Sequence, residues 1–149
     1  MSSSENDQNI ELKIQKDIRE AEDDLVTWIQ SALDNEKSYD DLEESQFRNL
    51  LRVAETTESP EVVKNFLLYQ VGRDKKWGRG EDSLAHRIIA DINTRIEEKA
   101  KKITDSYPDK LKKVKMELIR RYLGYGARHL KYLNFKKSEK KSSKSNKSN

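Results

Sequence analysis

Residues 84–103 read LAHRIIADINTRIEEKAKKI, and their apolar side chains return every three or four positions. Leu84, Ile88, Ile92 and Ile96 therefore fall on one side of a helix, and the charged residues Arg87, Asp91 and Arg95 lie between them. This period predicts an amphipathic helix that buries one face. No stretch of the chain alternates strictly enough between apolar and polar residues to predict a strand.

The same helical period continues on both sides of this stretch. It predicts further helices within residues 10–38, from about 42 to 54, from 60 to about 72 and from 108 to about 134. The connections between them are short. We therefore expect an all-α protein, a compact bundle of about five helices.

Two of these helices carry start signals. Ser59 and Pro60 mark the third helix, because a serine hydroxyl accepts a hydrogen bond from a free N–H and proline fits the first helical position. Asp40 or Asp41 is the expected cap of the second helix.

Both ends of the chain are polar. Residues 1–9 show no apolar period and predict a disordered leader, and residues 135–149 are almost entirely Lys, Ser and Asn and predict a disordered basic tail. Residues 10–134 then form a single helical domain.

The composition excludes several classes of protein. Charged residues make up 38% of the 149 residues and there is no cysteine, which excludes disulfide scaffolds and thiolate metal sites. No apolar run approaches the ~20 residues that span a bilayer. We expect a soluble, cytoplasmic protein without a membrane partner.

The net charge of +3 conceals an uneven distribution. Residues 1–70 hold 7 Lys and Arg against 17 Asp and Glu, whereas residues 71–149 hold 23 against 10. An acidic first half and a basic second half suggest two unlike surfaces, one of which meets a polyanion. Two ordinary solvated surfaces are the alternative.

The sequence contains little that indicates a catalytic or a metal-binding site. Asp82 and His86 are four residues apart, but a metal site requires a third ligand. The chain has no phosphate-binding loop and no nucleophile elbow. We expect no catalytic residue, no metal, no cofactor and no small-molecule substrate, and hence no enzyme.

Positive charge gathers in three places. Arg48 and Arg52 share one stripe of the second predicted helix, where they serve either internal salt bridges or an outside anion. The glycine-rich loop around Trp77 gathers further cations, and the ring either stacks on a base or anchors the loop to the core. The loop cations are Arg73, Lys75, Lys76 and Arg79.

The third place is the last predicted helix, where Arg121, Arg128 and Lys131 form a stripe. Gly124 lies within it and costs ~1 kcal/mol of helix stability relative to alanine. Either another helix packs closely against Gly124 and Gly126, or a sugar–phosphate backbone lies in a flat gap. The tyrosines of this helix are either core residues or base-stacking residues. Such cations contact a nucleic-acid backbone without reading sequence.

Three short motifs follow one another in the chain. They are SQFRNLL at residues 45–51, FLLYQVGRD at residues 66–74 and YLGYGARHLKY at residues 122–132. In this order they resemble the small subunit of type III CRISPR–Cas effector complexes, of the Csm kind (subtype III-A), over residues 42–134. A related type III subtype fits as well, because the acidic helical extension 10–38 and the lysine-rich tail are absent from short family members.

The resemblance implies a non-catalytic helical subunit in antiviral defence. Copies of such subunits line the groove that holds the duplex of crRNA and target RNA, next to backbone subunits and a large subunit. Arg48, Arg73 and Lys131 match motif positions, whereas the other candidate cations follow from charge geometry. A helical protein–protein adaptor and a standalone nucleic-acid-binding bundle are the alternatives.

Overall fold

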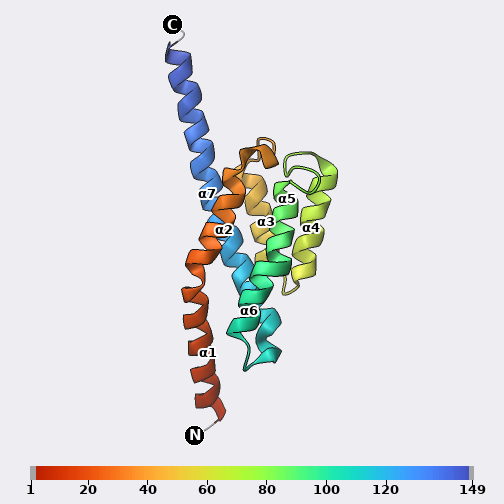
Figure 1. The fold of residues 1–149 in the computed structure, drawn as a ribbon, viewed down its shortest axis with the longest axis vertical. Coiled ribbons are helices and arrows are strands. Elements are labelled where there is room, and N and C mark those ends of the chain that lie inside the picture. The colour runs from red at the N-terminus through yellow and green to blue at the C-terminus, as the bar shows by residue number, and fades with distance from the viewer. Residues whose placement is uncertain (1–2, 148–149) are drawn as a thin grey trace.

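The computed structural model describes residues 3–147, and all of its regular elements are helical (Figure 1). The α-helices are α1 (Ser3–Glu20), α2 (Glu22–Asp34), α3 (Glu44–Thr56), α4 (Pro60–Arg73), α5 (Leu84–Asp91), α6 (Glu97–Ile103) and α7 (Leu111–Lys147). A π-helical turn, η2 (Ile92–Ile96), joins α5 to α6, and short 3-10 turns occupy η1 (Glu36–Ser38) and η3 (Pro108–Lys110). The predicted all-α class is confirmed.

The five predicted helical segments are all present, two of them with an internal irregularity. The first is divided into α1 and α2 at Ala21, whose N–H donates to the carbonyl oxygens of both Asp17 and Ile18 (3.2 and 3.0 Å). The fourth runs without a break from α5 through η2 to α6. Both irregularities keep the apolar side chains on the buried face, because Ala21, Ile92 and Ile96 are buried.

The helix caps confirm one prediction and correct another. The Ser59 hydroxyl accepts a hydrogen bond from the Val62 N–H at the start of α4, as predicted. The predicted Asp40 or Asp41 cap of α3 is wrong, because α3 begins later and Glu43 is its N-cap. There the Gln46 side-chain oxygen accepts a hydrogen bond from the Glu43 N–H (3.1 Å). This reciprocal arrangement satisfies the free N–H groups without an aspartate.

Helix α7 is the central element of the bundle and packs against α2 and α3. Its buried face includes Leu118, Tyr122 and Leu130, all without solvent exposure. The Tyr122 hydroxyl donates to Oδ2 of buried Asp91 (2.7 Å), which ties α7 to α5. The core therefore forms around one long helix.

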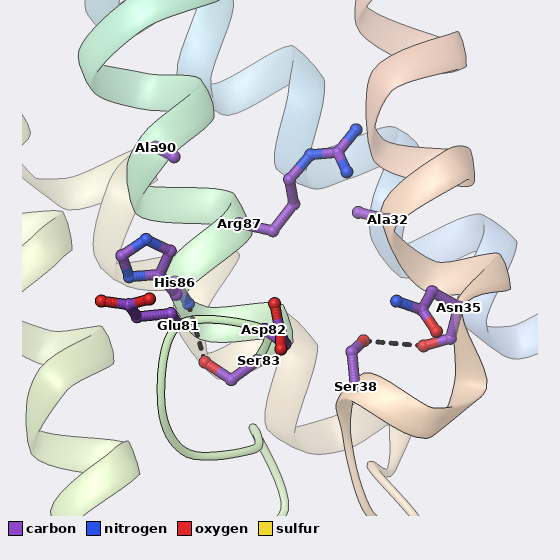
Figure 2. A pocket seen from close by; sticks show the side chains of 9 residues that line it. All are labelled: Ala32, Asn35, Ser38, Glu81, Asp82, Ser83, His86, Arg87 and Ala90. Atoms are coloured by element: carbon purple, nitrogen blue, oxygen red, sulfur yellow. Dashed lines mark hydrogen bonds between the residues drawn. The ribbon is translucent and has the colours of Figure 1, made fainter.

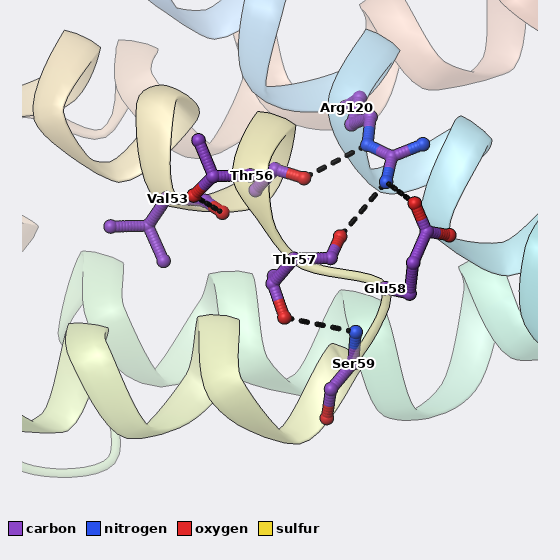
Figure 3. Close-up of polar contacts among 7 residues, drawn as sticks. Val53, Thr56, Thr57, Glu58, Ser59 and Arg120 are labelled. Carbon is purple, nitrogen blue, oxygen red and sulfur yellow. Dashed lines mark hydrogen bonds and ion pairs between the residues drawn. The ribbon is translucent and has the colours of Figure 1, made fainter.

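A second polar contact fixes α7 to the turn between α3 and α4 (Figure 3). The guanidinium of Arg120 donates to the carbonyl oxygens of Ala54 and Thr57, both at 2.8 Å, and pairs with Glu58 at 3.0 Å. Two of the last carbonyls of the α3 segment thus gain partners that the helix itself cannot supply.

The structure differs from the sequence prediction at both ends of the chain. Helix α1 already begins at Ser3, and α7 continues to Lys147 through the predicted disordered tail. Residues 4–9 and 138–143 are exposed, so these turns add no core. Helix extension nevertheless costs little once a helix is formed. Residues 1–2 and 148–149, which the predicted leader and tail include, lie outside the described residues.

Figure 1 shows an elongated molecule in which the two chain ends point in opposite directions. Helix α1 extends below the bundle and the last turns of α7 extend above it. The acidic start and the basic end of the chain are therefore far apart.

Candidate nucleic-acid interface

The glycine-rich loop between α4 and α5 is anchored by Trp77. Its ring is fully buried and lies 5.5 Å from the ring of Phe47, centroid to centroid. The Trp77 carbonyl accepts a hydrogen bond from the Ala85 N–H (3.1 Å). Of the two interpretations of this residue, the structure supports the anchor, because a buried ring cannot stack on a base.

Gly78 holds the loop against the turn before α3. Its φ of +78° lies in the left-handed region, and a Cβ placed there would meet the Ser38 carbonyl oxygen at 2.1 Å. The Asp40 N–H donates to the Lys76 carbonyl oxygen (3.1 Å), and Figure 1 shows the two loops side by side. The loop cations are therefore presented on a packed backbone.

Three loop cations have no carboxylate partner within the described residues. The guanidinium of Arg73 lies 5.8 Å from the centroid of the Tyr69 ring, and Arg79 Nε donates to the Val71 carbonyl oxygen (3.4 Å). The Lys75 side chain is exposed. Lys76 differs, because its Nζ lies 3.4 Å from Glu43 Oε1.

The start of α3 collects three of the predicted binding residues around two glutamates. Arg48 Nε lies 2.6 Å from Glu44 Oε1, and Lys131 Nζ of α7 lies 3.7 Å from Glu44 Oε2. The hydrogen bond from Arg48 lowers the pKa of the Glu44 carboxyl, and the charge of Lys131 lowers it further. Lys76 completes the group through neighbouring Glu43. These pairs are exposed, and exposed ion pairs are worth little to stability.

Arg52 and Arg128 are exposed and lack carboxylate partners in the described part of the chain. Arg52 Nη1 donates to the Asn49 side-chain oxygen one turn away (3.1 Å). Arg128 borders a groove between α2 and α7. Both guanidinium groups are therefore open to an outside anion.

Arg121 differs from the other predicted binding residues because two glutamates hold its guanidinium group. Its guanidinium pairs with Glu22 at the start of α2 and with Glu117 on its own helix. The side chain is only 28% exposed. The pairing gives Arg121 a structural function, in which it holds α7 against α2.

For the two glycines of α7, the sequence left open either close packing of another helix or a gap for a sugar–phosphate backbone. A Cβ on Gly126 would lie 2.6 Å from Phe47 Cζ and 2.8 Å from Ile29 Cγ1, so this glycine permits close helix packing. A Cβ on Gly124 would meet nothing within 4 Å. The space beside Gly124 is therefore open.

The salt bridge of Arg48 is one of the two alternatives that the sequence left open, whereas the ion pairs of Lys76, Arg121 and Lys131 were not predicted. The four-residue spacing of Glu44 and Arg48 was the available signal, because such pairs face each other on a helix. The contacts of Lys131 and Lys76 join residues far apart in the chain, so no local pattern indicates them.

The hollow beside the start of α5 has a different character (Figure 2). It measures about 270 Å³ between α2 and α5, and its lining includes Glu81, Asp82 and His86. The Ser83 hydroxyl caps α5 by accepting from the His86 N–H (3.1 Å). Within the described residues, no three His, Asp or Glu side chains lie close enough together to hold a metal ion.

Two further findings concern the whole described chain. None of its described helices combines the length and the apolar character needed to cross a membrane. Comparisons with protein-family models, with curated proteins and with solved structures return no match.

Proposed function

We propose that this chain is a non-catalytic RNA-binding protein, the small subunit of a type III CRISPR–Cas ribonucleoprotein complex. In this function it lines the groove for the duplex of crRNA and target RNA and contacts the phosphate backbone. The CRISPR assignment rests on the three motifs at residues 45–51, 66–74 and 122–132.

One observation carries the RNA-binding part of the proposal. Five of the nine predicted cations have no carboxylate partner among the described residues, although acidic side chains are abundant in the chain. These five are Arg52, Arg73, Lys75, Arg79 and Arg128. Exposed cations whose charge no carboxylate neutralises are available to phosphates, and each phosphate contact releases counterions.

The remaining candidates contribute less directly. Arg48, Lys76 and Lys131 each have a glutamate partner that an approaching phosphate would have to replace. These pairs are exposed and weak, so the exchange costs little. Arg121 is excluded from the proposed contact surface, because its two glutamates hold it against the bundle.

A protein–protein adaptor is the second candidate function, and the outer face of α4 favours it. Val62, Leu68 and Tyr69 are 45%, 59% and 58% exposed, beside a groove of about 580 Å³ between α4 and α5. Exposed apolar patches commonly mark contacts between proteins. In the CRISPR proposal this face would meet the backbone subunits, the large subunit or another copy of the chain.

Purification of the tagged full chain from its own cells at low salt separates the two functions. The proposal expects an A260/A280 ratio above that of protein alone, together with short guide RNAs, backbone subunits and a large polymerase-like subunit. Nuclease treatment should then lower the A260/A280 ratio to that of protein alone. Recovery of protein partners with no nucleic acid would contradict the proposal and support the adaptor.

A further inference from the structure

Helix α7 carries two exposed aromatic rings and a third ring that packs at the edge of the core. Tyr132 is 54% exposed, Phe135 is 58% exposed, and Tyr125 is half-buried. Their spacings of seven and three residues place them on one face of the helix. Exposed aromatic rings grouped on one stripe form an apolar patch, and such patches commonly mark binding sites.

Cations alternate with these rings on the same face. Arg128 follows Tyr125 by three residues, and Lys136 Nζ lies 5.4 Å from the centroid of the Tyr132 ring. We call Tyr125, Arg128, Tyr132, Phe135 and Lys136 the aromatic stripe. It combines flat apolar surfaces with positive charge.

A groove runs beside the stripe and supplies a second wall. It measures about 380 Å³ and is lined by Val26 and Gln30 of α2 together with Tyr125, Arg128, His129 and Tyr132 of α7. The size lies within the range of small-ligand sites. The Gln30 amide offers both a donor and an acceptor to a bound group.

Two carboxylates of α2, one turn before and one turn after the groove residues, already have partners. Asp34 Oδ1 lies 2.7 Å from His129 Nε2, and Glu22 pairs with Arg121. Arg128 has no carboxylate partner within the described residues. The groove therefore keeps an uncompensated positive charge next to its aromatic wall.

We propose that the aromatic stripe binds an unpaired stretch of nucleic acid, whose bases stack on the rings while Arg128 and Lys136 contact its phosphates. Aromatic side chains in a positively charged groove are the common means of binding single strands, and stacking is tolerant of sequence because every base has a flat face. A duplex cannot use these rings, because its bases are already stacked on one another.

This inference rests on the proposed function in that the ligand is a nucleic acid; Arg128 serves both, but the stacking rings are not among the cations that carry the proposed function. Backbone binding by Arg73, Lys75 and Arg79 depends on charge and serves duplex and single strand alike. Stacking on Tyr132 and Phe135 depends on exposed base faces and serves the single strand alone. The two contributions can therefore be measured separately.

The test is fluorescence anisotropy of the full chain with three labelled probes: a uridine dodecamer, a thymidine dodecamer and an RNA duplex of equal length. The variant Tyr132→Ala/Phe135→Ala removes two rings and no charge. Tyr132→Phe keeps the ring, and Leu12→Ala removes an exposed apolar side chain (67%) from α1. Far-UV circular dichroism confirms that each variant is folded.

We expect the double variant to bind the uridine dodecamer about a hundredfold more weakly, roughly tenfold for each ring. Duplex affinity and the salt dependence should stay the same, and Tyr132→Phe and Leu12→Ala should behave as the wild type. An equal loss of affinity for the thymidine dodecamer would show that the stripe binds unpaired bases in both RNA and DNA. A loss with uridine alone assigns it to RNA.

Unchanged affinity for both single strands would overturn the stacking site while leaving backbone binding intact. Equal weakening for duplex and single strand would also overturn it. A double variant that binds RNA normally but loses a co-purifying protein would show that the stripe is a protein-docking face. Failure of the wild-type chain to bind any of the three probes would overturn both this inference and the proposed function.

Discussion

Two glycines of α7, two residues apart, lie in opposite environments. Gly126 is enclosed by Phe47 and Ile29, whereas the position of a Cβ on Gly124 is open. Their sequence context is similar, with a tyrosine next to each. The difference arises from tertiary packing, so no local pattern distinguishes them.

The paired alanine variants should therefore change stability in opposite directions. Gly124→Ala should stabilise the protein by about 1 kcal/mol, because alanine is the better helix former and meets no neighbour. Gly126→Ala should destabilise it by about 1–3 kcal/mol through overpacking against Phe47. Urea unfolding followed by circular dichroism measures both. Stabilisation by Gly126→Ala would contradict the packing described here.

Tyr39 gives a prediction for alkaline pH. Its hydroxyl donates to the Leu33 carbonyl oxygen (2.7 Å), and burial, followed by the charges of Glu36 and Asp34, raises its pKa from 10.0 to about 12. The folded chain therefore holds this proton more tightly than the unfolded chain does. Its contribution to stability is complete below pH 10 and is lost as the pH rises through 12.

The variant Tyr39→Phe tests this assignment. Loss of the hydrogen bond should lower the free energy of unfolding by about 1 kcal/mol at pH 8. Between pH 10 and 12, however, the variant should lose stability less steeply than the wild type, because one of the groups that titrate there is absent. Urea unfolding at a series of pH values measures the two slopes. Parallel slopes would contradict a raised pKa at Tyr39.

At the level of elements, the helical period predicted most of the fold, and the exceptions have physical causes. The segments were predictable because each apolar face repeats over several turns. The break at Ala21 and the π-helical turn at Ile92–Ile96 were not, because both keep the apolar side chains buried and leave no mark on the pattern. The helical ends were missed because helix extension requires no burial.

The contact between Arg120 and the end of α3 yields a prediction at this scale. Arg120→Ala should lower the free energy of unfolding by about 1.5–3 kcal/mol, because the carbonyls of Ala54 and Thr57 lose a charged donor. Arg52→Ala is the matched control, since Arg52 is exposed and bonds only within its own helix. Its effect should stay within about 0.5 kcal/mol. Equal effects of the two substitutions in urea unfolding would refute the structural function of Arg120.

Across the whole molecule, opposite charges from the two halves of the sequence meet. Lys99 pairs with Asp24, Arg121 with Glu22 and Lys131 with Glu44, because α7 and α6 pack against the acidic helices. The uneven charge of the sequence therefore does not become two wholly separate surfaces. Within the described residues, the cations without a carboxylate partner include Arg73, Lys75 and Arg79 of the loop after α4 and Arg128 of α7.

The location of the candidate site was predictable from the sequence, but the ion pairing of its individual residues was predictable only in part. Charge clustering located the loop and the stripe on α7, but it could not tell Arg128, which is open, from Arg121, which is held by two glutamates. Glu117, four residues before Arg121, was a local signal for this difference, but Glu22 lies on α2, ninety-nine residues earlier in the chain. Trp77 likewise required the structure, because a tryptophan in a basic loop fits both an anchor and a stacking residue.

The central claim is that the exposed cations without a carboxylate partner among the described residues bind an RNA backbone. The salt dependence of RNA affinity tests this claim most directly. The double variant Arg73→Glu/Arg128→Glu is compared with Lys16→Glu/Lys101→Glu, which makes the same change of net charge at exposed lysines (69% and 64%) on α1 and α6. We expect the first variant to bind RNA more weakly and to reduce the slope of log K against log salt by roughly 2. The second variant should keep a slope close to that of the wild type. Equal slopes and equal affinities for the two variants would contradict the claim.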